Sequence, residues 1–192
     1  MMQVIKSVKK ITKEKFINLY KANYLVGKNK YPYLIASRRD IKNLSINTKN
    51  KITDAVKILP YIVENDEISV IITKEFRYAV NDYVYSLPAG LVDPGENIAE
   101  SAMRELKEEI GGDILILEQI TNCGYTSEGF TDESLVCFKA QVKLGENNLE
   151  AFEDINIEIV KLKDILVYTE NKNFNLVSLL LLKNFYLENF TK

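Results

Sequence analysis

The sequence contains no histidine, and this absence excludes several kinds of active site. A serine–histidine triad, a histidine-ligated zinc ion and an imidazole general base cannot be built from this chain. Any acid–base or metal chemistry that the chain performs must therefore use carboxylates.

Cysteines and long apolar runs are also few. Cys123 and Cys137 lie too far apart for a CxxC site, so we expect free buried thiols in a reducing cytoplasm. The leucine run at 179–182 is far shorter than the ~20 residues of a membrane span. The first residues, MMQVIKSVKKITKEK, lack the apolar core of a signal peptide. We therefore expect a cytoplasmic chain with no membrane partner.

Neither sign of charge dominates the chain. It has 25 lysines and arginines against 27 acidic residues, a net charge of −2, so no basic field favours nucleic acid and we expect none as a partner. With 46% hydrophobic residues in 192, the composition is that of one ordered globular domain with a small extension.

Strand patterns outnumber helix patterns. Residues 1–48 form a strand-rich extension (FINLYKANYLV and YPYLIASRR), and the polar stretch 40–51 is the expected linker to a main domain at 49–192. A hairpin is expected around ENDE, between AVKILPYIV and ISVIITKEFR. Further strands are expected at 114–120, 134–142 and 155–162, and helices after Asn97, at 163–168 and at 176–190. The predicted class is α+β with a mixed sheet.

The helix after Asn97 is the best defined element. Asn97 is a good N-cap, Glu100 stands at the capping-box position, and Gly111 with Gly112 ends the helix. Its apolar residues, Ile98, Ala99, Ala102, Leu106 and Ile110, form one buried stripe. We expect Glu100, Arg104 and Lys107 on the opposite, solvated side.

Three acids of this helix, Glu105, Glu108 and Glu109, lie between these two faces. One interpretation is a solvated acidic face, because like charges one turn apart cost only ~0.2–0.5 kcal/mol. The other is a metal site, because carboxylates at the edge of a core need a compensating cation and hard divalent ions take oxygen ligands. The helix alone leaves both interpretations open.

The stretch GLVDPGENIAESAMRELKEEIGG, residues 90–112, contains glycine, glutamate and an REL-x-EE-x-G run at characteristic spacing. This pattern resembles the Nudix box of the Nudix hydrolases. The box normally closes with an aliphatic residue where this chain has Gly112, which we expect to loosen local packing without affecting the ligands. The resemblance implies an α/β/α sandwich and hydrolysis of a nucleoside diphosphate linked to another group.

The resemblance also assigns roles to residues. It implies that Glu105 and Glu109 bind Mg²⁺ or Mn²⁺ and are catalytic, with the carbonyl of Ala89 and with Glu108 as further ligands. Glu96 and Arg104 are the implied orienting pair. Gly90 brings the backbone close to the metal and the substrate phosphates.

The flanks are similar to the ADP-ribose pyrophosphatase branch of this family, through Glu75-Phe76-Arg77, LPAGLVDPGE and the N-terminal extension. In that branch the extension exchanges between the subunits of a homodimer and helps to form the substrate pocket. Arg77 matches a substrate-contacting position, with a surface arginine as the alternative. The aromatic residues that could stack on a base are Tyr20, Tyr24, Tyr31 and Tyr33.

One position departs from the branch. Ser127-Glu128-Gly129 has glutamate where members specific for ADP-ribose have proline, which puts a strict preference for ADP-ribose in doubt. The general base of the branch lies on a loop before the last strand, so Glu153 is the first candidate, followed by Glu150 and Glu133.

The sequence therefore predicts a metal-dependent homodimeric hydrolase that splits ADP-ribose or a related nucleoside diphosphate sugar into AMP and a sugar phosphate. Two alternatives stay open at this point. One is a broader pyrophosphatase for dinucleotides such as NADH or FAD. The other is a module that binds ADP-ribose without cleaving it.

Overall fold

The computed structural model describes residues 3–48, 52–144 and 155–190. It divides the chain into two compact units. The first comprises Met1–Asp54 and Cys123–Leu135, and the second comprises Ala55–Asn122 and Val136–Lys192. Each unit therefore contains segments that are distant in the sequence.

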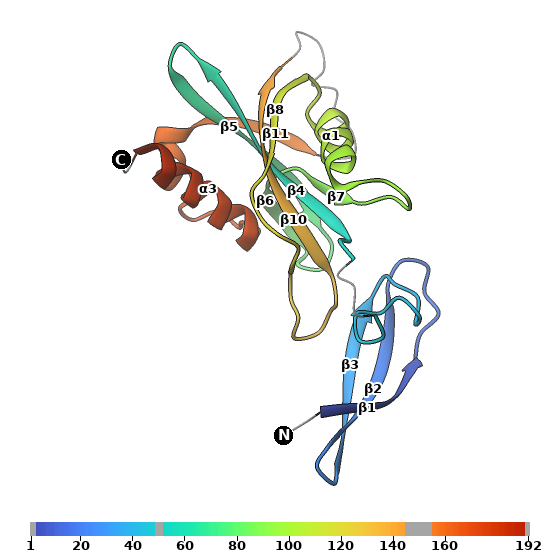
Figure 1. The fold of residues 1–192 in the computed structure, drawn as a ribbon. Coiled ribbons are helices and arrows are strands. Elements are labelled where there is room, and N and C mark those ends of the chain that lie inside the picture. Colours follow the sequence, from blue (N-terminus) through green and yellow to red (C-terminus); the bar gives the residue numbers. More distant parts are fainter. Residues whose placement is uncertain (1–2, 49–51, 145–154, 191–192) are drawn as a thin grey trace. The chain divides into compact units, whose positions relative to one another are not determined.

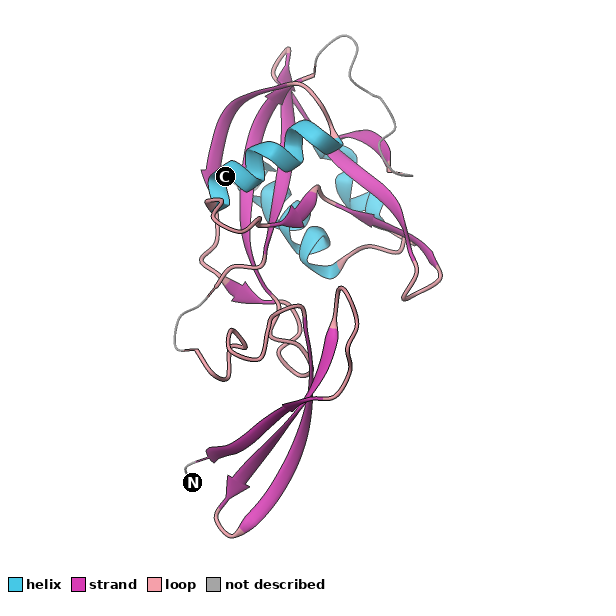
Figure 2. Cartoon of the chain, turned by 90° about the vertical axis from the view of Figure 1, so that its right-hand side faces the viewer, coloured by secondary structure: helices cyan, strands magenta, loops and turns pink. Residues whose placement is uncertain are grey.

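The first unit is built on a three-stranded antiparallel sheet (Figure 2). Its strands are β1 (Gln3–Lys10), β2 (Asn18–Val26) and β3 (Asn29–Ser37). Gly27, with φ of 63°, makes the tight turn between β2 and β3, which glycine adopts without strain. A small core of Tyr20, Ala22, Ile35 and Leu44 lies beneath the sheet.

Two features of this unit differ from the sequence analysis. Strand β1 was not predicted, because its alternation of lysine with apolar residues leaves almost all of it exposed. Leu44, within the polar stretch expected to be a linker, is fully buried in the core of the unit. One apolar side chain thus anchors a stretch whose composition is that of a loop.

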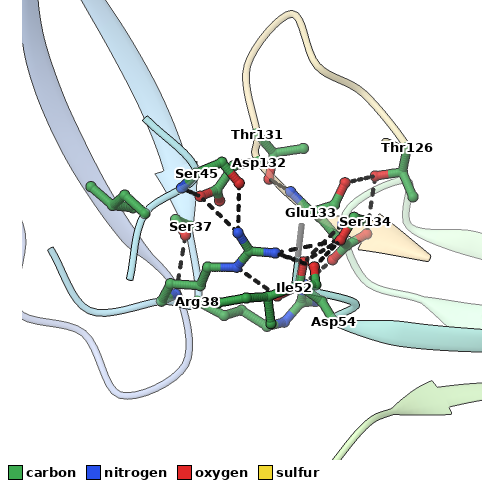
Figure 3. A network of polar contacts seen from close by, with 12 residues as sticks. Ser37, Arg38, Ser45, Ile52, Asp54, Thr126, Thr131, Asp132, Glu133 and Ser134 are labelled. Atoms are coloured by element: carbon green, nitrogen blue, oxygen red, sulfur yellow. Dashed lines mark hydrogen bonds and ion pairs between the residues drawn. The ribbon is translucent and has the colours of Figure 1, made fainter. Parts of the chain in front are cut away.

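The segment 123–135 belongs to the first unit and contains the short strand β9 (Gly124–Tyr125), which pairs with the first residues of β10 (Ser134–Lys143). Strand β9 was also not predicted, because two residues carry no periodicity. The amide of Ala36 donates to the carbonyl of Phe130. Figure 3 shows the polar network of this region, in which Asp54, Asp132 and Ser134 converge.

The second unit contains the larger sheet, in the order β11-β5-β4-β10-β8. Strand β6 pairs with β5, and β7 pairs with β4. The remaining strands of this sheet are β4 (Ala55–Glu64), β5 (Glu67–Arg77), β6 (Asp82–Ser86), β7 (Ala89–Leu91), β8 (Asp113–Gln119) and β11 (Asn156–Lys161). The hairpin of β4 and β5 turns at Asn65 and Asp66, whose positive φ angles of 50° and 62° suit the tight turn expected at ENDE.

Helices cover both faces of this sheet (Figure 1). Helix α1 (Ile98–Glu109) lies on one side and α3 (Leu176–Phe190) on the other, and the short η1 (Leu162–Asp164) and α2 (Ile165–Thr169) precede α3. A buried cluster that includes Leu59, Ile72 and Leu182 joins α3 to the sheet. This arrangement confirms the predicted α+β class and the helix at 176–190.

No helix in the described part of the chain has the length and apolar character of a membrane span.

Candidate active site

Helix α1 begins where the sequence predicts, because its first turn is capped twice. The side chain of Asn97 accepts hydrogen bonds from the amides of Ala99 and Glu100, at 3.0 and 2.9 Å. The carboxylate of Glu100 accepts in return from the amide of Asn97 at 3.3 Å, which completes a capping box. These bonds fix the rotation of the helix, and Ala102, Leu106 and Ile110 on its inner face are buried.

The end of α1 also follows the sequence. Gly111 and Gly112 have φ angles of 63° and 91°, a conformation that side-chain-bearing residues avoid. A Cβ atom on Gly112 would lie 2.5 Å from the carbonyl oxygen of Lys143. The unusual glycine at the end of the box therefore permits a close backbone contact, and the expected loosening of the packing is not what the structure shows.

The two glycines of the loop before α1 serve different purposes. Gly95 has a φ of 88° and open space around it, so the turn itself requires a glycine. Gly90 has an ordinary φ, but a Cβ atom at this position would overlap the carboxylate of Glu105. Gly90 is thus required for the close approach of strand β7 to that carboxylate.

Arg104 holds this region together. Its guanidinium donates to both oxygens of Glu96, each at 3.0 Å, and to the carbonyl of Leu91 at 3.0 Å. It also donates to Glu105 at 2.7 Å and to Glu108 at 3.1 Å. The expectation that Arg104 lies on the solvated face is wrong, since only 29% of its side chain is exposed. Its length lets it wrap back to the loop and the acids.

Glu96 is the best satisfied of these acids. Besides Arg104, it accepts hydrogen bonds from the hydroxyl of Ser101 and from the amide of Asp93. The bonds from Arg104, and next from Ser101, lower the pKa of Glu96 to about 2. Glu96 is therefore ionised at any physiological pH and fixes the orientation of Arg104.

Glu109 and Glu105 are in the opposite situation. Burial raises the pKa of Glu109 to about 7. The amide of Ala89, 3.4 Å away, lowers this pKa, and the nearby charges of Glu105 and Glu75 raise it. Burial also raises the pKa of Glu105 despite its bond to Arg104. Burial therefore disfavours the ionised forms of both carboxylates, although Glu105 pairs with Arg104.

These acids face one cavity of about 510 Å³. The cavity is lined by Glu75, Arg77, Ala89, Glu105, Glu108, Glu109 and Ile155. The structure thus brings together the predicted ligands with Arg77, which pairs with Glu75 at 2.8 Å. Glu96 lies behind the acids and reaches them through Arg104.

The acids suit a hard divalent ion. Carboxylate and carbonyl oxygens are the donors that Mg²⁺ and Mn²⁺ prefer, and Mg²⁺ usually binds through a few carboxylates together with substrate phosphates and water. Among the described residues, no three acidic or cysteine side chains converge closely enough to hold an ion by themselves. The donor set therefore fits an ion whose coordination is completed by main-chain oxygen, substrate and water.

Two residues of this region were not identified as site residues from the sequence. Glu75 lines the cavity, and Lys57 is 6% exposed behind strand β7. Burial, and next the charge of Arg77, lower the pKa of Lys57 to about 8. The available signal was a lysine inside the apolar run AVKILPY, which departs from what a buried strand requires.

The structure describes one of the three candidates for the general base. Glu153 and Glu150 fall outside the described residues. Glu133 belongs to the first unit, where its carboxylate binds Arg38 and the hydroxyl of Thr126. Its acceptor oxygens are therefore already occupied.

The four tyrosines of the extension lie in three different environments. Tyr20 is fully buried, and its hydroxyl donates to the carbonyl of Arg39 at 2.7 Å, so it is a core residue. Tyr24 and Tyr33 pack edge to face and line, with Glu128, a cavity of about 270 Å³ within the first unit. Tyr31 is exposed.

Comparison with known proteins gives a consistent result. Residues 52–180 match the model of the NUDIX domain. The chain is 33% identical over 128 residues to the ADP-ribose pyrophosphatase of Bacillus subtilis, a match that covers 65% of this chain and 69% of that protein. It is 31% identical over 117 residues to the ADP-ribose pyrophosphatase of Saccharomyces cerevisiae, covering 56% of this chain and 50% of the relative.

A solved structure shares the fold. The crystal structure of an ADP compounds hydrolase superposes with a TM-score of 0.70 at 19% sequence identity, covering 98% of this chain and 95% of that one. The match supports the architecture derived above, including the presence of the N-terminal sheet.

Proposed function

The chain belongs to the Nudix hydrolase family, and from this premise we propose that it hydrolyses the pyrophosphate bond of ADP-ribose or a related nucleoside diphosphate sugar. The products are AMP and a sugar phosphate. The observation that carries this proposal is the cavity lined by Glu105, Glu108 and Glu109, where the single guanidinium of Arg104 serves both Glu105 and Glu108 and burial raises the pKa of Glu109.

The proposed cofactor is Mg²⁺ or Mn²⁺, held by Glu105 and Glu109 with the carbonyl of Ala89 and with Glu108. Such an ion neutralises phosphate oxygens and lowers the pKa of a bound water. The protein contributes the fixed geometry, because Arg104 and Glu96 restrict the positions that Glu105 and Glu108 can take.

Arg77 and Glu153 have proposed roles in substrate binding and proton transfer. Arg77 lines the cavity with 51% of its side chain exposed, so its guanidinium is accessible to a phosphate group. Glu153 is the proposed general base, which accepts a proton from the attacking water. Gly90 lets the backbone pass beside the carboxylate of Glu105, which a Cβ atom there would overlap, and its proposed role is this close approach of the backbone to metal and phosphates.

Glu128 favours a second candidate substrate class. It stands where members of the branch specific for ADP-ribose have proline, and it lines an aromatic cavity with Tyr24 and Tyr33. This departure supports a substrate range wider than ADP-ribose, which includes dinucleotides such as NADH or FAD. We therefore keep a broader dinucleotide pyrophosphatase as the alternative.

We further propose a cytoplasmic homodimer in which the N-terminal extension, residues 1–48, contributes to the interface and to the substrate pocket. The exposed apolar side chains of the extension, among them Leu34 and Tyr31, support an interface there. Light scattering on the purified chain tests the dimer.

Release of AMP with Mg²⁺ from a panel of ADP-ribose, other ADP-sugars, NADH and FAD tests the function. Fastest turnover of ADP-ribose supports the first proposal, and fastest turnover of a dinucleotide supports the alternative. Tight binding without product from any of them overturns both and indicates a binding module. The Glu153→Gln variant tests the base, since wild-type turnover in this variant removes Glu153 from that role.

A further inference from the structure

A network of buried polar side chains lies behind the segment that carries the proposed metal-binding carbonyl. Lys57, Ser86 and Ser178 are 6%, 5% and 0% exposed. The ammonium of Lys57 donates to the hydroxyl of Ser86 at 3.0 Å and to the carbonyl of Leu87 at 3.5 Å. Burying an ammonium group is unfavourable unless hydrogen bonds compensate for its lost hydration, so these bonds of Lys57 need an explanation.

The network continues into the first turn of α3. The hydroxyls of Ser86 and Ser178 are 3.2 Å apart, and the hydroxyl of Ser178 donates to the side chain of Asn175 at 3.1 Å. Asn175 also accepts from the amide of Ser178 at 3.0 Å, as an N-cap residue does. Because lysine only donates, Ser86 accepts from Lys57, and the single hydroxyl hydrogen of Ser86 can bond either to the carbonyl of Leu87 at 3.1 Å or to Ser178.

This network fixes the backbone next to the cavity. The amide of Leu87 donates to the hydroxyl of Ser178 at 3.1 Å, and the carbonyl of Leu87 accepts from Lys57. The carbonyl of Pro88 accepts from the amide of Ile58 at 2.8 Å. Ala89 then pairs with Lys57 in the sheet. Residues 87–89 are therefore held at each position.

The start of α3 is itself anchored to the same strand. The amide of Tyr85 donates to the carbonyl of Asn173 at 2.7 Å, and the amide of Asn175 donates to the carbonyl of Tyr85 at 2.8 Å. The helix cannot shift relative to residues 85–87 without breaking these bonds. Because the start of α3 is fixed to strand β6 in this way, Ser178 can hold residues 87–89 in a defined position.

We propose that Lys57 and Ser178 are positioning residues that hold residues 87–89, and with them the carbonyl of Ala89, in the geometry required for metal binding. This inference rests on the proposed function. It adds a polar connection between the interior of α3 and the acidic cavity, which the family motif at residues 90–112 does not contain.

The first test measures two properties of the substrate-free protein. The Kd for Mn²⁺ is determined by titration followed by electron paramagnetic resonance, and exchange of the Leu87 amide is followed by NMR without metal. For Ser178→Ala and for Lys57→Met we expect a Mn²⁺ Kd raised about ten-fold, as for loss of a residue supporting a metal ligand. Exchange at Leu87 should accelerate about ten-fold in Ser178→Ala, because its acceptor is gone.

Two control variants separate positioning from general destabilisation. Ser178→Thr keeps the hydroxyl and should restore the wild-type Kd. Leu182→Val, one turn further along α3 in the apolar cluster, should lower Tm without changing either property. A wild-type Kd in both Ser178→Ala and Lys57→Met overturns the proposal, as does an equal rise in Leu182→Val.

If Ser178→Ala does not fold, Lys57→Met alone decides through its Mn²⁺ Kd. The exchange measurement requires neither metal nor substrate. An absence of hydrolysis in the wild type therefore overturns the proposed function without altering the result at Leu87.

Discussion

Two arginines of this protein each gather carboxylates, and the results are chemically different. We use the name Arg104 cluster for Arg104 with Glu96, Glu105 and Glu108, and the name Arg39 cluster for Arg39 with Ser45, Asp54, Asp132 and Ser134. The first borders the cavity of the second unit. The second lies within the first unit (Figure 3).

The Arg39 cluster is saturated. Arg39 donates to Asp54 at 2.8 and 2.5 Å, to Ser45 at 2.6 Å and to the carbonyl of Ile52 at 2.8 Å, and its side chain is 7% exposed. Asp54 also accepts from the amide of Ser134 at 2.8 Å. Because the donors and acceptors of this cluster pair with one another, it offers a ligand no uncompensated charge.

The Arg104 cluster has a surplus of negative charge. One guanidinium serves three glutamates. Among the described residues, the hydrogen-bond donor to Glu109 on the same helix is the amide of Ala89 at 3.4 Å. The difference shows that a buried group of charges is a candidate site when charge of one sign is left over beside a cavity. The number of ion pairs alone does not indicate function.

The largest expected effect comes from neutralising Glu109, which lies beside the Arg104 cluster, and is compared with neutralising an acid of the Arg39 cluster. Glu109→Gln should reduce kcat with Mg²⁺ and ADP-ribose about 10³-fold, or ~4 kcal/mol, because a metal ligand is lost. Asp132→Asn makes the same chemical change in the Arg39 cluster and should leave kcat of the folded protein within about two-fold. An equal loss in both variants would contradict the distinction between the clusters.

Removing the arginine of each cluster should affect the free energy of unfolding in the opposite order to the effects on kcat, with the larger loss in the Arg39 cluster. Arg39→Met leaves Asp54 and Asp132 buried without their cation, and should lower the free energy of unfolding by about 3–5 kcal/mol. Arg104→Met should cost less, about 1–2 kcal/mol, because the Arg104 side chain is 29% exposed against 7% for Arg39, so water can replace it beside its carboxylate partners. Denaturant unfolding measures both, and a larger loss for Arg104→Met would show that the acidic cluster is the structural one.

A pair of glycine variants tests whether the close approach of the Gly90 backbone to Glu105 matters for activity. Gly90→Ala places a methyl group on the carboxylate of Glu105 and should lower kcat/KM about 10²-fold by displacing it. Gly95→Ala strains a backbone with φ of 88° and should cost roughly 1–2 kcal/mol of stability with little effect on kcat. Steady-state kinetics on the folded variants decides, and near-normal turnover in Gly90→Ala would contradict the proposed contact.

The smallest effect is a pH dependence of the metal-free protein. Between about pH 4.5 and 7 the folded chain retains a proton at Glu109 that the unfolded chain releases, so this group lowers stability as the pH rises through that window. Glu96 acts in the opposite direction, because its contribution is present above pH 4.5 and is lost as the pH falls toward about 2.

Thermal unfolding without metal between pH 5 and 8 measures this dependence. Glu109→Gln should flatten it and raise the stability at pH 8 by about 1–2 kcal/mol. Excess Mn²⁺ should also prevent the loss of stability of the wild type at high pH, since the ion compensates the charge of ionised Glu109. A pH dependence unchanged in the variant would exclude Glu109 as its source.

The acidic cavity was largely predictable, because its parts are close together in the sequence. Glu96, Arg104 and the acids of α1 lie within a few turns of one another, and the cap at Asn97 sets which way they face. Helical periodicity cannot show, however, that Arg104 bends back toward the loop. That depends on where the loop carbonyl of Leu91 and the carboxylate of Glu96 are placed.

The sequence by itself determined the class of fold, the position and ends of α1, and the set of acids available for a metal, since each follows from local propensity or from spacing of a few residues. Only the tertiary structure decided that Tyr20 is a core residue, that Arg39 joins Asp54 and Asp132, and that Lys57 and Ser178 hold the backbone of Leu87. These contacts join residues up to about a hundred positions apart. Their partners are chosen by the packing of whole elements, which no local pattern encodes.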